Sequence, residues 1–247
     1  MWKFFHKLAS PPHFYRMAPG FILGFGVIGI LLILWGTYAG LFLAPIDYQQ
    51  KDAFRIIYVH VPAAYLSMMG YSIMAIATGI GLIWRMKLAH AVAAATAPIG
   101  AWFTFVALAT GSIWGRPMWG TWWEWGDPRL TSELLMLFLY FGYIALRSAI
   151  DDTAKADKSS AVLALVGGVN IPIIHYSVTW WTSLHQGQTV MKGKMPPEML
   201  NPLLINILGF TLLFGALLLY GVRTEVLRRE HRARWVKDML VPGTGEA

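Results

Sequence analysis

The sequence has no cysteine among its 247 residues and few charged side chains. The absence of cysteine excludes disulfide bridges, thiolate ligands and zinc-finger spacings. Charged residues make up 13% of the chain, whereas a soluble domain has about 25%. Hydrophobic residues make up 56%. This imbalance excludes an ordinary soluble domain and indicates an integral membrane protein.

Six apolar runs approach the roughly 20 residues that a helix needs to cross a bilayer, at residues 20–42, 61–84, 91–113, 130–150, 161–178 and 203–222. We expect helices because lipid offers backbone groups no hydrogen-bond partner, and because the alternating pattern of a barrel strand is absent. Glu133 and Arg147 lie inside the fourth run, so we expect them to snorkel or to face protein near its ends. The prediction is an all-α membrane protein, a polytopic bundle of six transmembrane helices that forms a single domain over residues 1–247.

The middles of these runs contain no Asp, Glu, Lys or Arg. Ionisable residues inside a membrane mark proton relays and ion-coupled pathways, so their absence disfavours a proton-coupled transporter. The polar residues Asn170 and Asn206 and the prolines Pro98 and Pro172 are expected to serve helix packing and local kinks.

The distribution of Lys and Arg predicts how the bundle is oriented. The amino terminus together with the second, fourth and last connections carries 14 of the 20 basic residues, and the other three connections carry six. The positive-inside rule therefore places both termini in the cytoplasm, and it explains the net charge of +7 without a nucleic-acid partner. We expect the tail 224–240 to continue the last span as a basic helix able to bind anionic lipid or a cytoplasmic subunit.

Three connections are predicted to face outward. The first ends with His60, two residues before Pro62, so the second helix should begin close to His60. The second is a tryptophan-rich loop at residues 114–129. The third contains His185 and ends with Asn201 and Pro202, which we expect to be the N-cap and first residue of the last helix.

The tryptophan-rich loop holds five tryptophans within twelve residues: Trp114, Trp119, Trp122, Trp123 and Trp125. If residues 119–125 were helical, three of these indoles (119, 122 and 123) would share one face. Such a face would be a flat apolar surface for a planar ligand. The alternative is an interfacial aromatic belt that anchors the bundle. The density of indoles, with glycines and prolines between them, favours the ligand surface over the belt.

Three of the seven histidines, His60, His175 and His185, map to the outer side, whereas His6, His13, His90 and His231 map to the cytoplasmic side. A neutral imidazole is a good iron ligand, and ligands on separate helices can approach a flat macrocycle from opposite faces. His60 and His185 fit this arrangement. His175 is expected to be structural, because ten residues of continuous helix would separate it from His185 by about 15 Å.

Several charged residues accompany these groups on the outer side. The cations Arg55, Arg116 and Arg129 are able to pair with carboxylates such as propionates. Asp127 is a candidate for orienting an arginine or an indole N–H. Glu133 is interpreted as an acid in the first turn of the fourth helix, where it would favour the helix dipole.

Three segments together resemble a known family: WGRPMWGTWWEWGDPRLTSELLMLFLY at 114–140, RIIYVHVPAAY at 55–65 and PIIHYSVTWWTSLHQG at 172–187. The first is similar to the tryptophan-rich WWD signature of the haem-handling membrane proteins of cytochrome c maturation. The other two resemble the histidine regions of the short, six-span CcmC branch of that family. The resemblance runs along nearly the whole chain, and one local difference is that Gly126 separates the last tryptophan from Asp127.

The resemblance implies a protein that binds haem b as transient cargo at the periplasmic face of the bacterial inner membrane. It implies that His60 and His185 are the axial ligands of the haem iron, and that the tryptophan loop presents the haem to the periplasmic haem chaperone CcmE. The remaining residues of the implied haem site are Trp114, Trp119, Trp122, Trp123, Trp125, Asp127, Arg55 and Arg129. The implied partners are the ABC transporter subunits CcmA and CcmB and the small membrane subunit CcmD.

Two other functions remain open. A transmembrane haem transporter would carry haem through the bundle, although the sequence has no ATP-binding motif and no pair of interrupted helices. A structural subunit would use the tryptophan loop only as a belt. The residues single out no acid, base or nucleophile, so we do not expect an enzyme in the ordinary sense.

Overall fold

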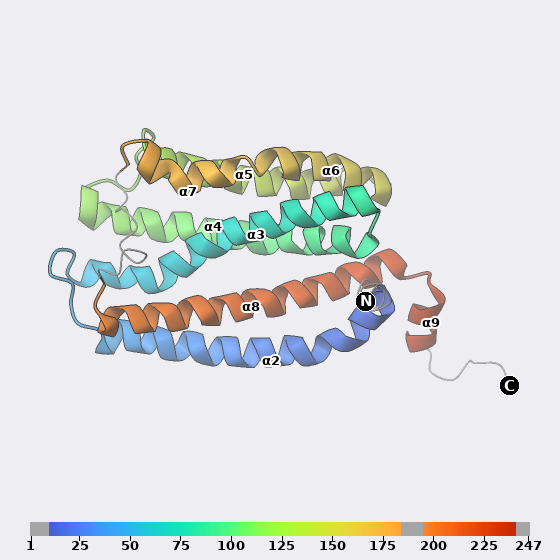
Figure 1. The fold of residues 1–247 in the computed structure, drawn as a ribbon, viewed down its shortest axis with the longest axis horizontal. Coiled ribbons are helices and arrows are strands. Elements are labelled where there is room, and N and C mark those ends of the chain that lie inside the picture. The colour runs from blue at the N-terminus through green and yellow to red at the C-terminus, as the bar shows by residue number, and fades with distance from the viewer. Residues whose placement is uncertain (1–9, 184–194, 241–247) are drawn as a thin grey trace.

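The computed structural model describes residues 10–183 and 195–240, and the regular structure in these ranges is helical (Figure 1). In chain order the elements are α2 (Pro11–Tyr38), η1 (Ala39–Leu43), η2 (Asp52–Ile56), α3 (Ile57–Trp84), α4 (Lys87–Trp119), α5 (Pro128–Ser148), α6 (Thr153–Gly167), α7 (Asn170–Trp180), α8 (Pro197–Glu230) and α9 (Arg234–Leu240). Within the described ranges, six helical segments are long and apolar enough to cross a membrane. The prediction of an all-α membrane protein with six spans is confirmed, and the chain is a multi-pass membrane protein.

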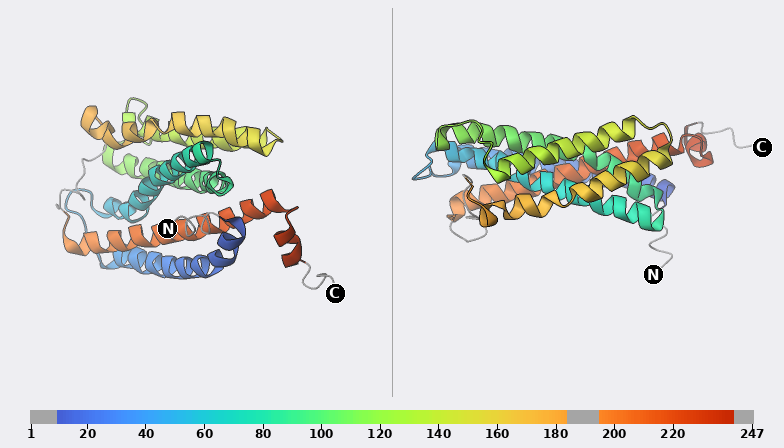
Figure 2. Two further views of the ribbon diagram at one scale, coloured as in Figure 1. Left: turned by 45° about the vertical axis from the view of Figure 1, so that its right-hand side comes forward. Right: turned by 90° about the horizontal axis from the view of Figure 1, so that it is seen from above.

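The spans form layers that run roughly parallel (Figures 1 and 2). Helices α2 and α8 lie side by side along one flank, α3 and α4 pack together in the middle, and α5 packs against α6 and α7 on the other flank. The contact between α2 and α8 is close because two glycines meet there. A Cβ added to Gly29 would lie 2.9 Å from the carbonyl oxygen of Gly209, so only small residues permit this approach.

Several helices extend well beyond the apolar runs that predicted them. Helix α2 begins at Pro11, and α4 continues to Trp119. The last helix begins at Pro197, so the expectation that it starts at Asn201 and Pro202 is wrong. Pro197 suits the first helical position, and Glu198 adds a favourable charge in the first turn. The apolar run marks the part of a helix that lies in hydrocarbon, whereas these polar and proline signals mark its end.

The fifth span is interrupted between α6 and α7. The break lies at Gly168 and Val169, and the Ile171 N–H donates to the carbonyl oxygen of Gly168 at 3.1 Å. Pro172 has no N–H and cannot donate to the carbonyl four residues earlier, so an uninterrupted ladder is impossible here. Asn170 is buried and its Nδ2 donates to the backbone oxygen of Ser132 on α5 at 2.8 Å. The expected kinking and packing roles of Pro172 and Asn170 agree with this arrangement.

The tail does not continue α8 as one helix, contrary to the sequence-based expectation. Helix α8 ends at Glu230, and after a turn α9 folds back near the start of α2 (Figure 1). The indole of Trp235 lies 5.6 Å from the ring of Tyr15 and donates from Nε1 to Glu230 at 2.6 Å. The turn allows this amphipathic side chain to pack on α2, which a straight helix would not.

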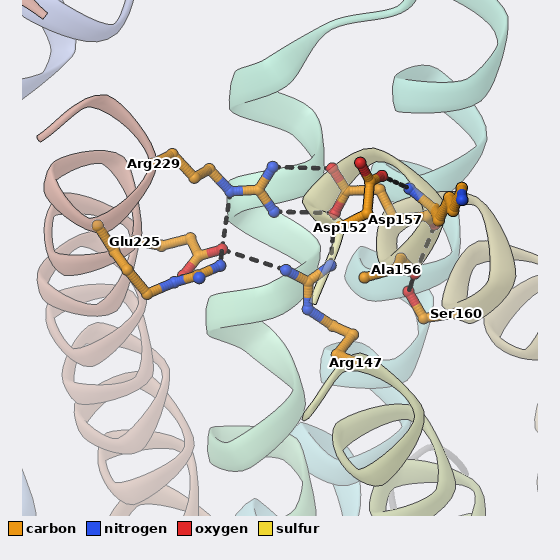
Figure 3. Close-up of polar contacts among 9 residues, drawn as sticks. Arg147, Asp152, Ala156, Asp157, Ser160, Glu225 and Arg229 are labelled. Atoms are coloured by element: carbon orange, nitrogen blue, oxygen red, sulfur yellow. Dashed lines mark hydrogen bonds and ion pairs between the residues drawn. The ribbon is translucent and has the colours of Figure 1, made fainter. Parts of the chain in front are cut away.

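The two ends of the bundle differ in character. The start of α2 and helix α9 lie at one end, where arginines and acids of α5, α6 and α8 form an ionic cluster (Figures 1 and 3). The connections from η1 to α3 and from α4 to α5 lie at the opposite end. His60 and the tryptophan-rich loop therefore occupy the end that lacks the ionic cluster.

Candidate functional site

His60 lies at the beginning of α3, in the first turn after Ile57, close to where the sequence predicted a helix start. Its Nδ1 lies 3.0 Å from Oγ1 of Thr110 on α4. Its ring meets the ring of Trp114 edge-on, with centroids 5.5 Å apart. A Cβ added to Gly111 would lie only 3.2 Å from Cε1 of His60. Three residues within five positions of α4 thus form a seat for the imidazole.

The residues around the His60 ring also contact the connection between η1 and η2. The Trp114 indole donates from Nε1 to Oε1 of Gln50 at 2.9 Å, and Gln50 is buried. Asp47 holds the turn around Gln50, because its Oδ1 accepts from the backbone N–H groups of Gln49 and Gln50 at 2.9 and 2.7 Å. The orientation of Trp114 beside His60 therefore depends on a connection more than sixty residues earlier in the chain.

The tryptophan-rich loop is not a continuous helix. Helix α4 ends at Trp119, because Gly120 adopts a left-handed conformation with φ of +77° that glycine accommodates easily. Residues 121–127 have no helical structure. The condition under which indoles 119, 122 and 123 would share a helical face is therefore not met, since the helix stops after the first of them.

The five indoles have different environments. Trp114 and Trp119 occupy the last turns of α4, with ring centroids 6.4 Å apart. Trp123 is half-buried and packs against a core cluster with residues from α3 to α7, where its Nε1 has no hydrogen-bond partner. Trp122 and Trp125 are 57% and 72% exposed. The loop therefore combines a wall next to His60, a side chain inserted into the core, and two indoles on the surface.

An open apolar groove of about 480 Å³ lies beside Trp125. Its walls come from α5 and from the start of α7 and include Phe138, Ile173 and Asn170. Its size is within the range of about 300–1,000 Å³ that is common for small-molecule sites. The groove lies near the end of the bundle that carries the tryptophan-rich loop, and a smaller hollow lies beside His60.

Asp127 is the N-cap of α5. Its Oδ1 accepts from the backbone N–H groups of Arg129 and Leu130 at 2.9 and 3.0 Å, and its Oδ2 accepts from Ser183 at 2.7 Å. The side chain is 3% exposed. The carboxylate thus fixes the start of α5 and ties the tryptophan-rich loop to the segment after α7. These partners are backbone amides and a serine, and the expected role of Asp127 in orienting an arginine or an indole N–H stays a prediction.

The smaller hollow lies between His60, Arg129 and Glu133. It holds about 20 Å³, which is room for one water molecule. Glu133 is buried there and accepts from Oγ of Ser67 at 2.6 Å. The interpretation of Glu133 as a first-turn acid is wrong, because it lies beyond the first turn of α5 and faces α3 within the bundle. The expectation that it faces protein is met.

The other two cations singled out in the sequence, Arg55 and Arg116, stabilise local backbone. Arg55 donates from Nη1 to the carbonyl oxygen of Gly40 at 2.8 Å and pairs with Asp52 at 3.0 Å. Arg116 donates to the carbonyl oxygen of Gly120 at the end of α4. Both cations lie at helix ends, at the end of the bundle that carries His60.

Comparison with known proteins identifies relatives along the whole chain. The family model described as Heme exporter protein C matches residues 4–237. The chain belongs to this family. A protein named Heme exporter protein C from Escherichia coli (strain K12) is 51% identical over 241 residues, covering 98% of each chain. The protein of that name from Haemophilus influenzae is 46% identical over 242 residues, covering 97% of this chain and 98% of its own. The one from Paracoccus denitrificans is 40% identical over 240 residues, covering 94% and 97%.

In this member of the Heme exporter protein C family, the structure describes His175 but not His185. His185 lies outside the described residues, and so does its predicted pairing with His60. His175 lies on α7, half-buried, with its ring edge-on to Tyr176 at 4.7 Å. The structural role expected of His175 stays a prediction.

Sequence reasoning missed the residues that position His60 in this family member, namely Thr110, Gly111 and Gln50. A signal for part of the seat was present. Thr110 and Trp114 are four residues apart, so they lie on one face of a helix that leads directly into the tryptophan-rich loop. The involvement of Gln50 had no local signal, because it comes from another connection.

Proposed function

We propose that this protein binds haem at the outer face of the bacterial inner membrane and delivers it to the periplasmic haem chaperone CcmE during maturation of c-type cytochromes. The observation that carries the proposal is the placement of His60, which sits at the end of the bundle that carries the tryptophan-rich loop, in a seat made by Thr110, Gly111 and Trp114. The names of the relatives, Heme exporter protein C, support haem as the cargo.

The residues present fit a haem. Haem iron takes axial ligands above and below its plane, and a neutral imidazole is among the commonest of them. His60 would supply one ligand. We propose His185 for the other, from the third outer connection. Indoles suit the apolar face of a porphyrin, and the Trp114 ring lies against His60 with the Trp119 ring next to it.

The environments of the indoles suggest a division of roles. Trp114 and Trp119 would form the wall next to the iron ligand, and Trp123 would hold the loop on the core. The exposed Trp122 and Trp125 would contact the haem where the chaperone must reach it. Asp127 would keep the loop in place through α5, and Arg55 and Arg129 are proposed as cations for the propionates. Haem that is held through its iron and one side of the macrocycle would leave an edge accessible for transfer to the chaperone.

The proposal also includes the setting in the cell. The excess of basic residues at the end opposite His60 supports cytoplasmic termini and a periplasmic site. We further propose that the protein works with the ABC transporter subunits CcmA and CcmB and the small membrane subunit CcmD. Its role is to handle and transfer haem, and the proposal assigns no enzymatic step to its side chains.

A second candidate function is the passage of haem through the bundle. The interruption of the fifth span at Gly168 and Val169, beside the groove that Asn170 lines, favours it, because non-helical backbone at membrane depth usually faces protein or a cavity. Haem supplied only to the cytoplasmic face of sealed vesicles distinguishes the two functions. In these vesicles the periplasmic face points to the lumen. Haem that reaches a chaperone in the lumen without CcmA and CcmB supports passage through the bundle. Haem that stays in the medium supports a protein that only binds haem at the periplasmic face.

The experiment that tests the proposed function is an absorption spectrum of the purified protein after haem loading. We expect the low-spin spectrum of a haem with two imidazole ligands. His60→Ala and His185→Ala should each abolish or strongly change it. His231→Ala is the matched control, because this exposed histidine lies near the turn before α9 at the opposite end of the bundle. An unchanged spectrum in the variant that lacks both His60 and His185 would contradict the proposal.

A further inference from the structure

The hydroxyl of Thr110 has three possible partners. The carbonyl oxygen of Val106 lies 2.6 Å from Oγ1, the carbonyl oxygen of Ala107 lies 3.2 Å away, and Nδ1 of His60 lies 3.0 Å away. A hydroxyl has one proton to donate and lone pairs that accept. A carbonyl oxygen only accepts, so the short contact to Val106 requires the Thr110 proton. The hydroxyl is therefore left as an acceptor toward His60.

The acceptor role of the Thr110 hydroxyl determines which imidazole nitrogen of His60 carries the proton. Because Oγ1 of Thr110 accepts, Nδ1 of His60 must carry a hydrogen and donate it. In the neutral ring the lone pair is then on Nε2. A metal ion binds the nitrogen that has the lone pair, and the hydrogen bond made by the other nitrogen decides which one that is.

The rest of the seat restricts the ring to this orientation. The position next to Thr110 is Gly111, where even a methyl group would approach Cε1 of His60 to 3.2 Å. Trp114 packs edge-on against the ring from the following turn of α4, and its own orientation is held by the hydrogen bond to Gln50. The Nδ1 edge of the imidazole therefore faces α4 and is fixed there by contacts of three kinds.

We propose that Thr110 is a positioning residue that keeps His60 in the Nδ1–H tautomer and thereby presents Nε2 as the iron-binding atom. The inference rests on the proposed binding of haem at His60. Thr110 acts only through His60 and has no contact with the ligand in this scheme. Outer partners of metal-bound histidines change metal affinity by about 10–100-fold when they are removed, and we expect an effect of this size.

The first test needs no haem. The full-length protein in lipid nanodiscs, with ¹⁵N-labelled histidine rings, is examined by long-range ¹H–¹⁵N correlation spectra. His60 is assigned by the signal that disappears in His60→Gln. We expect a protonated Nδ1 and an unprotonated Nε2 in the wild-type protein and in Thr110→Ser. Thr110→Val has nearly the same shape but no acceptor, and it should populate the Nε2–H tautomer.

A control separates this effect from a general loss of a hydroxyl on α4. Thr104 is buried on the same helix and donates to the carbonyl oxygen of Gly100 at 2.8 Å. Thr104→Val should leave the His60 signals unchanged. A wild-type His60 with its proton on Nε2 would overturn the inference, even if every Thr110 variant failed to fold. Wild-type signals in a folded Thr110→Val would overturn it as well.

The second test adds haem. We expect Thr110→Val to bind haem about 10–100-fold more weakly than the wild type, with Thr110→Ser restoring affinity and the low-spin spectrum. The two tests also distinguish two failures. If His60→Gln binds haem with the wild-type spectrum, the proposed function fails while the tautomer assignment stands. If His60 binds the iron but Thr110→Val retains wild-type affinity and spectrum, the positioning role fails alone.

Discussion

Arg229 on α8 and Asp157 on α6 form a bidentate ion pair, with Nη1 to Oδ2 at 2.8 Å and Nη2 to Oδ1 at 2.9 Å (Figure 3). Their side chains are 10% and 9% exposed. Arg147 of α5 also binds Asp157, and Glu225 binds both Arg147 and Arg229, at 3.2 and 2.7 Å. The cluster links the α5–α6 hairpin to α8 at the end of the bundle opposite His60.

We predict that Asp157→Leu lowers the free energy of unfolding by about 3–5 kcal/mol, because two mostly buried guanidinium groups lose their shared carboxylate. Unfolding in mixed detergent, followed by circular dichroism, measures this change. The control is Arg228→Gln, since Arg228 pairs with Glu225 but is 57% exposed, and we expect an effect below about 1 kcal/mol. Equal effects of the two variants would show that the cluster contributes little.

Asp127 allows its structural role to be separated from a charge-dependent role. Asparagine can still accept hydrogen bonds at an N-cap, whereas alanine cannot. We predict nearly wild-type stability for Asp127→Asn and a loss of about 1 kcal/mol for Asp127→Ala. Thermal unfolding and haem titration are measured on both variants. If Asp127→Asn is stable but no longer binds haem, the carboxylate charge contacts the ligand and its role extends beyond the cap.

The indoles should separate by exposure. We predict that Trp123→Leu lowers stability by about 1–3 kcal/mol, because this ring packs on the core. Trp122→Leu and Trp125→Leu should leave the unfolding midpoint unchanged and reduce haem transfer to the chaperone. Haem bound and chaperone loaded are measured per protein molecule. Full loading by the Trp122→Leu/Trp125→Leu double variant would support a belt instead.

Topology is tested with reporters that become active only after export. A reporter fused after the carboxyl terminus should be silent, because the excess of basic residues at that end predicts a cytoplasmic location. A reporter inserted after Glu124, in the exposed part of the tryptophan-rich loop, should be active. The reverse pattern would mean an inverted bundle.

The sequence was sufficient for the architecture. Six apolar runs predicted six spans, because bilayer thickness sets the length of such a run and backbone hydrogen bonding requires helix inside it. The ends of the helices were less accurate. Trp119 closes α4 and Pro197 opens α8, several residues outside the apolar runs, because polar residues and prolines at the membrane surface continue a helix without a hydrophobic signal.

The candidate site was only partly predictable, because local sequence signals do not show how its side chains pack. Residue types and their places along the chain brought His60 and the five tryptophans to one end of the bundle, since each span returns the chain to the other side of the membrane. The sequence could not show that Gly120 stops the helix, nor that Trp123 turns inward while Trp122 and Trp125 face out. Those outcomes depend on how the loop meets the core.

The sequence by itself thus determined the membrane class, the number of spans and the chemistry available at the outer end. Only the tertiary structure decided that Thr110 binds His60, that Gln50 holds Trp114, and that Glu133 faces Ser67. Spans and their order follow from local hydrophobicity, which each segment carries alone. The orientation of His60 follows from packing between α3 and α4, where a hydroxyl, a missing Cβ and an indole from a distant part of the chain meet one ring.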